Sequence, residues 1–346
     1  MSATPRQAAP ANSDARAEAR HRFLKRAGWG DAKVSVLAAD ASFRSYHRAR
    51  RDGGTAVLMD APPDKEKPGD FVVIAARLNA LGLSAPKLLA ADLDSGFLLL
   101  EDLGDRTYTV ALADNDDETG LYEGATDTLI ALHQRWQPDM AGDLRPYDEA
   151  MLLEEAALLA DWTLSALFGS PPNAKVRAAY LDAWREVLPQ AAGLPETLVL
   201  RDYHVDNLMA LSGRVGVAAC GLLDFQDAVL GSPAYDLVSL LKDARRDVPG
   251  DLAERMLARY LAARPDIDPA AFQAAYRVLG AQRNAKVIGI FTRLSRRDGK
   301  PRYLVHMPRL WRLMEQDLAD PILAPVAAWF ARHLPPEARR TPGAST

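Results

Sequence analysis

The chain has 346 residues, 48% of them hydrophobic, with 42 basic and 46 acidic side chains. This length exceeds that of a usual single domain and predicts two domains or lobes with a sizeable core. The near balance of charge argues against nucleic acid or an anionic membrane surface as a partner. The single cysteine, Cys220, excludes an internal disulfide. The N-terminal segment lacks the apolar stretch of a signal peptide, and no segment approaches the length of a membrane span, so we expect a soluble cytoplasmic protein.

The first third of the chain predicts a small sheet with one helix. Asp52-Gly53-Gly54 is a good hairpin turn between two strand-like runs, and Asp94-Ser95-Gly96 is a second turn. The expected elements, in chain order, are strands at 34–40, 42–51 and 55–60, a helix at 71–83, and a buried strand at 97–100. Residues 1–16 and 337–346 are expected to be flexible tails because neither can bury apolar surface.

The remainder of the chain is dominated by helical patterns rich in alanine and leucine. Helices are expected at 122–136, 148–168 and 175–188, and again from Asp236 onward. These patterns predict an α+β architecture in two lobes. We expect a β-rich N-terminal lobe at 17–103 and a larger helical lobe at 104–336, with a cleft at their junction.

Two short apolar runs interrupt the helices, and each ends in an acidic residue. TLVLRD ends at Asp202, and VAACGLLDF contains Asp224 near its end, seventeen residues after Asn207. Phosphoryl transfer from ATP needs one carboxylate to orient the attacking hydroxyl and further oxygen ligands to hold Mg²⁺. Asp202 and Asn207 have the catalytic-loop spacing D-x-x-x-x-N, and Asp224-Phe225-Gln226 resembles a D-F-G metal ligand. The predicted catalytic residue is therefore Asp202, with Asn207 and Asp224 as Mg²⁺ ligands.

An isolated D-x-x-x-x-N is common, and its Asp and Asn are usually turn or cap residues. Here the conjunction favours a kinase, because two apolar strands each end in an aspartate and a β-rich lobe precedes them. No P-loop motif is present, which excludes a P-loop kinase. The six histidines are dispersed, so a zinc site is not expected.

The segments LRDYHVDNLM and GLLDFQDAVLGSPAYDLVSLLKDAR resemble the aminoglycoside-phosphotransferase (phosphotransferase enzyme) family over about 40–311. The resemblance implies a protein-kinase-like two-lobed fold, with ATP and Mg²⁺ as cofactors and a small hydroxylated metabolite as substrate. DASFRSYHR, FLLLEDLGDRTY, KVIGIFTRL and YLVHMPRLW are most similar to the bacterial anomeric kinases of N-acetylmuramate and N-acetylglucosamine. That similarity implies a sugar 1-phosphate product in peptidoglycan recycling, and no obligate protein partner is inferred.

The resemblance also implies roles for individual residues. Glu101-Asp102-Leu103-Gly104 matches the hinge, where the backbone at Glu101 and Leu103 would bind adenine. Asp40-Ala41-Ser42-Phe43-Arg44 takes the place of the phosphate-covering loop, so Ser42, Phe43 and Arg44 are expected to bind ATP. Asp236 is expected to brace the catalytic loop.

Two departures from the family pattern concern the phosphates and the catalytic loop. The third strand has Met59 and Asp60 where a phosphate-binding lysine is expected, and the helix at 71–83 has no glutamate to pair with it. Either a different cation serves the phosphates, with Arg44 or Arg48 as candidates, or ATP is bound weakly. The resemblance to the sugar-kinase group favours the first option. Leu200 stands where many relatives have a histidine two residues before the catalytic aspartate.

Four further residues are candidate substrate contacts: His204, Asp227, Arg245 and Arg293. His204 lies inside the catalytic loop, and Asp227 serves equally well as a turn cap. Lys242, Asp243, Arg245 and Arg246 form a charged cluster that is ordinarily a solvated face. Alternatively, Arg245, Arg246 or Arg293 meets the lactyl carboxylate of N-acetylmuramate.

Two other functions remain open on the sequence alone. An aminoglycoside, choline or homoserine kinase would keep the fold and change the substrate, although the cationic residues of the C-terminal half disfavour an aminoglycoside. A non-catalytic pseudokinase is suggested by the absent strand lysine. Retention of Asp202, Asn207 and Asp224 together argues against it.

Overall fold

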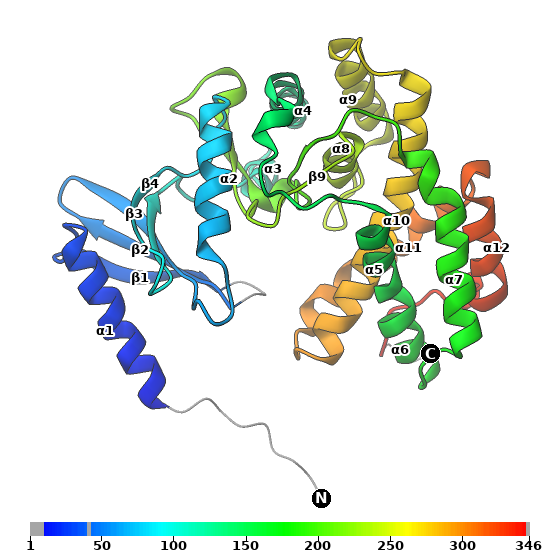
Figure 1. Cartoon of the computed structure of the whole chain (residues 1–346), viewed down its shortest axis with the longest axis horizontal. Coiled ribbons are helices and arrows are strands. Elements are labelled where there is room, and N and C mark those ends of the chain that lie inside the picture. The colour runs from blue at the N-terminus through cyan, green and yellow to red at the C-terminus, as the bar shows by residue number, and fades with distance from the viewer. Residues whose placement is uncertain (1–9, 40–42, 344–346) are drawn as a thin grey trace, which may run out of the picture. The chain divides into compact units, whose positions relative to one another are not determined.

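The computed structural model describes residues 10–39 and 43–343 (Figure 1). The chain forms two compact units. The first unit comprises the residues up to Arg106 together with Leu211–Asp227, and the second comprises Thr107–Ala210 together with the residues from Ala228 onward. Segment 211–227, which contains Asp224, thus groups with the N-terminal unit. The lobes predicted at 17–103 and 104–336 place this segment in the second lobe instead. Their role as functional domains stays a prediction.

The first unit contains a five-stranded antiparallel sheet in the order β1-β2-β3-β5-β4. Its strands are β1 (Lys33–Ala39), β2 (Ser45–Arg51), β3 (Gly54–Asp60), β4 (Leu88–Asp92) and β5 (Phe97–Glu101). Arg51 pairs with Gly54, which leaves a two-residue turn with Gly53 at a φ of 93°. Glycine adopts this conformation without steric cost, so the predicted hairpin is confirmed. The predicted helix is α2 (Pro68–Ala80).

Helix α1 (Pro10–Arg26) packs on one face of this sheet. Phe23 and Leu24 form a buried cluster with strand residues that include Ala56, Leu58 and Phe97. Figure 1 shows α1 and α2 on either side of the strands. The cluster consists of alternate residues of β3 and β5, as expected of a sheet with one face toward the helix.

The prediction of a flexible tail over residues 1–16 is wrong for residues 10–16, which are part of α1. Arg16 donates to the buried Asp60 at 2.6 Å and lies over the ring of Phe97. These contacts are long-range in sequence, so composition alone did not reveal them. Residues 1–9 lie outside the described residues.

The second unit is mostly helical. Its helices are α3 (Tyr108–Ala113), α4 (Glu118–Arg135), α5 (Glu149–Leu158), α6 (Ser165–Phe168), α7 (Ala174–Val187), α8 (Ala234–Leu241), α9 (Gly250–Ala263), α10 (Pro269–Arg296), α11 (Met307–Leu318) and α12 (Ala324–His333). A π-helical segment, Leu159–Leu164, joins α5 to α6 without a break, so the helix predicted at 148–168 is confirmed as one continuous run. Helix α3 was not predicted. Helix α10 contacts α5, α8 and α11 and is buried along most of its length.

Short strands frame the functional segments. β6 (Thr197–Val199) pairs antiparallel with β9 (Val229–Gly231) in the second unit. β7 (Leu208–Ala210) follows the catalytic loop, and β8 (Cys220–Leu222) precedes Asp224. Among the described residues, no helix is both long and apolar enough to cross a membrane.

The predicted C-terminal tail, 337–346, is wrong for its first residues. Arg339 donates to the carbonyl of Leu334 and lies over the ring of Phe330, and the carbonyl of Arg340 accepts a hydrogen bond from Trp311. One cation–π contact and two hydrogen bonds therefore fix a segment that has little apolar surface of its own.

Candidate active site

The predicted catalytic loop follows β6 in the second unit. Asp202 comes three residues after Val199, and a 3-10 turn spans Val205–Asn207. Arg201 has a φ of 69°, in the left-handed region that residues other than glycine seldom adopt. Such a conformation costs free energy and persists only where the surroundings hold it. Two sets of contacts hold Arg201, one to its backbone and one to its side chain.

Asp236 holds the backbone of the loop. It lies in the first turn of α8, is 1% exposed, and accepts hydrogen bonds from the N–H groups of Leu200 at 2.6 Å and Arg201 at 2.8 Å. Burial raises the pKa of Asp236 to about 7, against the opposing effect of these two hydrogen bonds. The expected bracing role of Asp236 is thereby confirmed.

Glu155 holds the side chain of Arg201. Glu155 is a buried residue of α5, and its carboxylate pairs with the guanidinium of Arg201 and, at 2.9 Å, with the ammonium of Lys286 on α10. The hydroxyl of Tyr147 also donates to it. Burial works against ionisation, but the two cations outweigh it and lower the pKa of Glu155. A single carboxylate thus compensates two buried cations next to the loop.

Asp202 is exposed to solvent, although protein surrounds it on most sides. Desolvation by that protein alone would raise the pKa of Asp202. The positive charges of Lys286, Arg283 and Arg201 outweigh this effect and lower the pKa below its ordinary value. Asp202 is therefore ionised near neutral pH and available to accept a proton.

Asn207 and His204 complete the loop. The side-chain amide of Asn207 donates to the carbonyl of Asp202 at 3.0 Å, which leaves the amide oxygen of Asn207 available as a ligand. His204 is 2% exposed, and burial holds its pKa well below the ordinary value, so the ring is neutral. This burial favours a positioning role for His204 over direct substrate contact.

Asp224 belongs to the first unit and has a φ of 56°, also left-handed. Its carboxylate accepts hydrogen bonds from Arg44 at 3.1 Å and from the side chain of Gln226 at 3.0 Å. The next residue, Phe225, is fully buried and packs on Phe71 of α2, with ring centroids 4.9 Å apart. Asp224 is thus fixed from both sides, with its side chain 32% exposed.

The hinge predicted at Glu101-Asp102-Leu103-Gly104 is anchored by Arg48. Arg48 pairs with Asp102 and Asp105 at 2.7 Å each and donates to the carbonyl of Gly104 at 3.1 Å. The N–H of Glu101 donates to the carbonyl of Lys87, and its carboxylate pairs with Arg214. Arg48 therefore holds the hinge in place.

The predicted substrate contacts differ in how they are engaged. Arg245 pairs with Asp206 at 2.9 Å and lies near Asp243, and Asp227 accepts a hydrogen bond from Gln226 at 2.8 Å. Arg246 pairs with Glu118 of α4. Arg293 is half-buried and forms no ion pair with the described residues, and its buried Nε has no hydrogen-bond partner among them.

The donors at Asn207 and Asp224 fit Mg²⁺. Mg²⁺ prefers hard oxygen ligands and is usually held by one or two protein groups together with water and substrate phosphates. A carbonyl oxygen at Asn207 and a partly exposed carboxylate at Asp224 are donors of this kind. No group of three or more His, Cys, Asp or Glu that could form a full protein cage occurs within 10–39 and 43–343, and such a cage is not required.

Comparison with known proteins identifies the family. The model of the phosphotransferase enzyme family matches residues 33–275. The chain belongs to this family. Proteins named N-acetylmuramate/N-acetylglucosamine kinase are similar over most of their length. The one from Caulobacter vibrioides is 40% identical, covering 95% of this chain and 99% of that protein, and the one from Pseudomonas aeruginosa is 39% identical over 84% and 86%.

Solved structures of distant sequence share the fold. A microcompartment-associated aminopropanol kinase matches with a TM-score of 0.61 at 15% identity, covering 87% of this chain and 98% of that chain. A complex of gentamicin with an aminoglycoside phosphotransferase matches with a TM-score of 0.60 at 15% identity over 86% and 98%. These likenesses concern the fold alone. They confirm the expected protein-kinase-like α+β class.

Sequence reasoning missed two carboxylates that the structure places next to predicted site residues. Glu155 is buried beside the apolar residues Leu152 and Ala156 of α5, and a charged residue among buried apolar neighbours is a detectable signal for a buried ion pair. Glu66 pairs with Arg44 at 3.9 Å and lies in the segment before α2, outside the helix predicted at 71–83.

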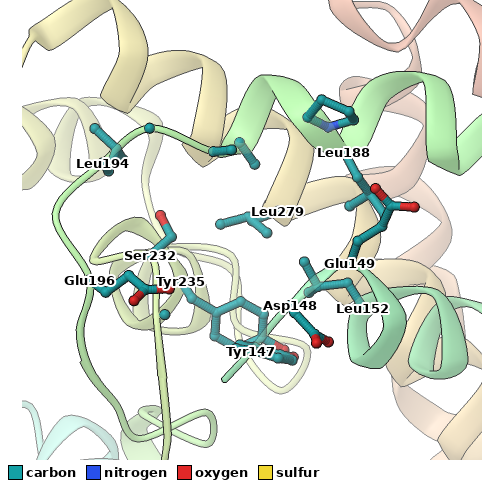
Figure 2. A pocket seen from close by; sticks show the side chains of 15 residues that line it. Tyr147, Asp148, Glu149, Leu152, Leu188, Leu194, Glu196, Ser232, Tyr235 and Leu279 are labelled. Atoms are coloured by element: carbon teal, nitrogen blue, oxygen red, sulfur yellow. The ribbon is translucent and has the colours of Figure 1, made fainter. Parts of the chain in front are cut away.

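The second unit also contains a pocket of about 350 Å³ that none of the predicted site residues lines. Figure 2 shows Tyr147 and Tyr235 beside one another in its wall, with ring centroids 4.9 Å apart. Tyr147 donates to Glu155, and Tyr235 accepts from Lys286 at 3.3 Å. The pocket therefore adjoins the buried network around Glu155, the carboxylate that pairs with Arg201.

Proposed function

We propose that the protein is an ATP-dependent kinase that phosphorylates the anomeric hydroxyl of N-acetylmuramate and N-acetylglucosamine. The supporting observation is the 40% identity to a kinase of that name over nearly the full length of both chains. Further support comes from the catalytic loop, in which Asp202, Asn207 and their bracing residues have the arrangement that phosphoryl transfer requires. The expected product is the sugar 1-phosphate, as an intermediate of cell-wall recycling in the cytoplasm.

In this mechanism Asp202 orients the sugar hydroxyl and accepts its proton. The hydroxyl oxygen forms a bond to the γ-phosphorus as the bond to the ADP oxygen breaks. An anomeric hydroxyl is more acidic than an ordinary alcohol, so a carboxylate whose pKa is lowered is still an adequate base. Asn207 and Asp224 would hold Mg²⁺, which supplies positive charge to the transferred phosphoryl group.

For nucleotide binding we propose the phosphate-covering loop and the hinge. Phe43 and Arg44 precede β2, and Ser42 lies outside the described residues. At the hinge, the N–H of Glu101 already donates to Lys87, so its carbonyl is the group left for the adenine amino group. The N–H of Leu103 would then donate to the ring.

The assay that tests this function measures ADP release with Mg²⁺, ATP and a panel of acceptors. We expect ADP release with N-acetylmuramate and N-acetylglucosamine, and a product that has lost its reducing end. We expect no ADP release with choline, homoserine or an aminoglycoside. Asp202→Ala should abolish turnover and leave ATP binding intact. If another acceptor alone gave turnover, that acceptor would be assigned as the substrate in place of the amino sugars. ATP binding without turnover on any acceptor would support a pseudokinase.

Discrimination between the two sugars is proposed to depend on Arg293. Of the cations considered for the lactyl carboxylate, Arg245 and Arg246 have carboxylate partners, whereas Arg293 forms no ion pair with the described part of the chain. Arg293→Ala should weaken the binding of N-acetylmuramate about tenfold or more. It should weaken the binding of N-acetylglucosamine, which lacks the carboxylate, far less. Equal losses on both sugars would contradict the assignment, and Arg296→Ala on the exposed side of α10 is the matched control.

A further inference from the structure

The two faces of the sheet in the first unit differ in what they present. Ala56 and Leu58 of β3 belong to the cluster beneath α1, so the alternate residues Val57 and Met59 point to the opposite face. Met59 pairs across the sheet with Tyr46. A lysine that binds nucleotide phosphates is expected near the end of the third strand of this fold, on the face away from α1. In this chain the buried Met59 stands at that position.

Arg44 is the residue immediately before the neighbouring strand, β2. It lies two residues before Tyr46, which makes it a diagonal neighbour of Met59, and such neighbours are about 7 to 8 Å apart at the backbone. An arginine side chain spans this distance. The guanidinium of Arg44 therefore reaches the region that the head group of a lysine at position 59 would occupy.

The surroundings of Arg44 hold its guanidinium in a fixed place. Arg44 is 8% exposed and lies between two carboxylates, Asp224 at 3.1 Å and Glu66 at 3.9 Å. Glu66 also accepts a hydrogen bond from the backbone N–H of Phe43 at 3.1 Å. One carboxylate thus restrains both the side chain of Arg44 and the backbone of the residue before it.

Glu66 is itself tied to the segment that contains Asp224. It lies two residues before the start of α2, and Phe71 on the first turn of that helix packs on Phe225. Helix α2 therefore positions Glu66 and the residue next to Asp224 together. A guanidinium between them lies beside the proposed Mg²⁺ ligand, where phosphate oxygens would approach.

Arg48, the other candidate cation, is not available for that purpose. Its guanidinium is shared among Asp102, Asp105 and the carbonyl of Gly104, at 2.7 to 3.1 Å. Releasing it would leave Asp102, whose carboxylate is nearly buried, without its cation.

We propose that Arg44 is the cation that binds the ATP phosphates in place of a lysine at position 59, and that Glu66 is the positioning residue for its guanidinium. Arg44 and Glu66 together take over the task of the usual lysine and glutamate pair, from a different strand and from the loop before α2. This inference rests on the proposed function, because it assumes that the chain binds ATP.

The test compares ligands that differ in their phosphates. Adenosine, ADP and a non-hydrolysable ATP analogue are titrated calorimetrically, with Mg²⁺, into the full chain and into Arg44→Ala. Adenosine affinity should be unchanged, whereas the analogue should bind about 10- to 100-fold more weakly, the loss expected for a charge-assisted hydrogen bond. Adding Met59→Lys to Arg44→Ala should restore at least tenfold of that loss.

Two further variants complete the design. Glu66→Gln should give a phosphate-selective loss of about 3- to 10-fold, because the guanidinium stays but is less well oriented. Arg50→Ala is the matched control, since Arg50 lies on β2, is exposed and donates a hydrogen bond to Ser35. It should leave all three affinities unchanged. Thermal unfolding of each variant checks that the fold is intact.

The outcomes separate this inference from the proposed function. If the unmodified chain binds none of the nucleotides, the proposed function fails. If it binds them and Arg44→Ala binds the analogue equally well, or loses adenosine in proportion, only the inference is overturned. Unchanged affinities in Glu66→Gln would overturn the role of Glu66, and a double variant no better than Arg44→Ala would overturn the equivalence with position 59.

Discussion

The side-chain amide of Asn207 donates a hydrogen bond to the backbone carbonyl of Asp202, with 3.0 Å between nitrogen and oxygen. This contact fixes which end of the amide faces the loop. The nitrogen faces inward, so the oxygen is presented for a cation. The same side chain therefore orders the proposed base and offers a metal ligand, and substitutions can separate the two tasks.

Asn207→Ala removes both groups, whereas Asn207→Asp keeps an oxygen ligand and loses the donor. We expect the Mg²⁺ concentration for half-maximal ADP release to rise about tenfold or more in Asn207→Ala and to change little in Asn207→Asp. Both variants should have lower kcat, because neither orders the carbonyl of Asp202. A Mg²⁺ titration of initial rates checks this. Identical Mg²⁺ requirements in all three proteins would contradict the ligand role.

Glu155 compensates two buried cations, so its neutralisation should be costly. Glu155→Gln leaves Arg201 and Lys286 without their shared carboxylate, and breaking a buried ion pair from one side typically costs about 3 to 5 kcal/mol. The free energy of unfolding, measured with urea, should fall by an amount of this order. Glu154→Gln is the matched control, because the neighbouring side chain is exposed, and its unfolding free energy should change by no more than about 0.5 kcal/mol.

If Glu155 and Glu154 variants lose equal stability, the buried network does not contribute as described. A second check uses Lys286→Met, which removes one of the two cations. Combined with Glu155→Gln it should cost less than the sum of the single changes, because the pair is lost only once.

The local features of this chain were predictable from sequence. Spacing within one loop identified Asp202 and Asn207, and alternation with Asp52-Gly53 identified the β2–β3 hairpin, because both signals lie within a few residues of one another. The bracing position of Asp236 was inferred by resemblance and is confirmed by its two hydrogen bonds.

The features that were missed depend on pairs far apart in the chain. Arg16 holds α1 to the sheet through Asp60, 44 residues later, and Arg44 meets Asp224 across 180 residues. A polar, alanine-rich segment such as 10–16 contains no local signal that one of its residues pairs with a buried carboxylate elsewhere in the chain. The helix predicted at 71–83 has no glutamate to pair with a strand lysine, and Glu66, which pairs with Arg44, lies just before that helix.

Gly289 on α10 illustrates a packing constraint that helix propensity would misjudge. A Cβ at this position would lie 2.3 Å from the backbone carbon of Leu158, at the junction of α5 and the π-helical segment. Replacing glycine with alanine in a helix ordinarily stabilises it by about 1 kcal/mol. Here Gly289→Ala should instead destabilise by about 1 to 3 kcal/mol, because backbone and not a flexible side chain must move.

Gly124→Ala on α4 is the matched control for Gly289→Ala. A Cβ at 124 would meet only the hydroxyl of Tyr108, at an ordinary 3.5 Å. Its free energy of unfolding should stay unchanged or rise by up to about 1 kcal/mol. Thermal and urea unfolding of both variants decides the matter, and a stabilised Gly289→Ala would show that the two helices can separate at little cost.

Asp236 should make stability depend on pH. Its folded-state pKa is raised to about 7 from an ordinary 3.8, so between about pH 4 and pH 7 the folded chain binds a proton that the unfolded chain has lost. The free energy of unfolding must therefore fall as pH rises through this window, and the stabilising contribution is fully present below it. Asp236→Asn cannot titrate, so this component of the slope should vanish in the variant.

Asp236→Asn also loses a hydrogen bond, and this loss lowers its free energy of unfolding. One amide oxygen cannot accept from both Leu200 and Arg201 as the two carboxylate oxygens do, and an unpaired buried N–H costs about 1 to 3 kcal/mol. At pH 5, Asp236→Asn should be less stable than the unmodified chain by about that amount. The gap should narrow by pH 8, where the unmodified chain must bury a charge. Urea unfolding at the two pH values measures both effects. A gap that stays the same from pH 5 to pH 8 would mean that Asp236 is ionised in the folded chain throughout this range, which would contradict the raised pKa.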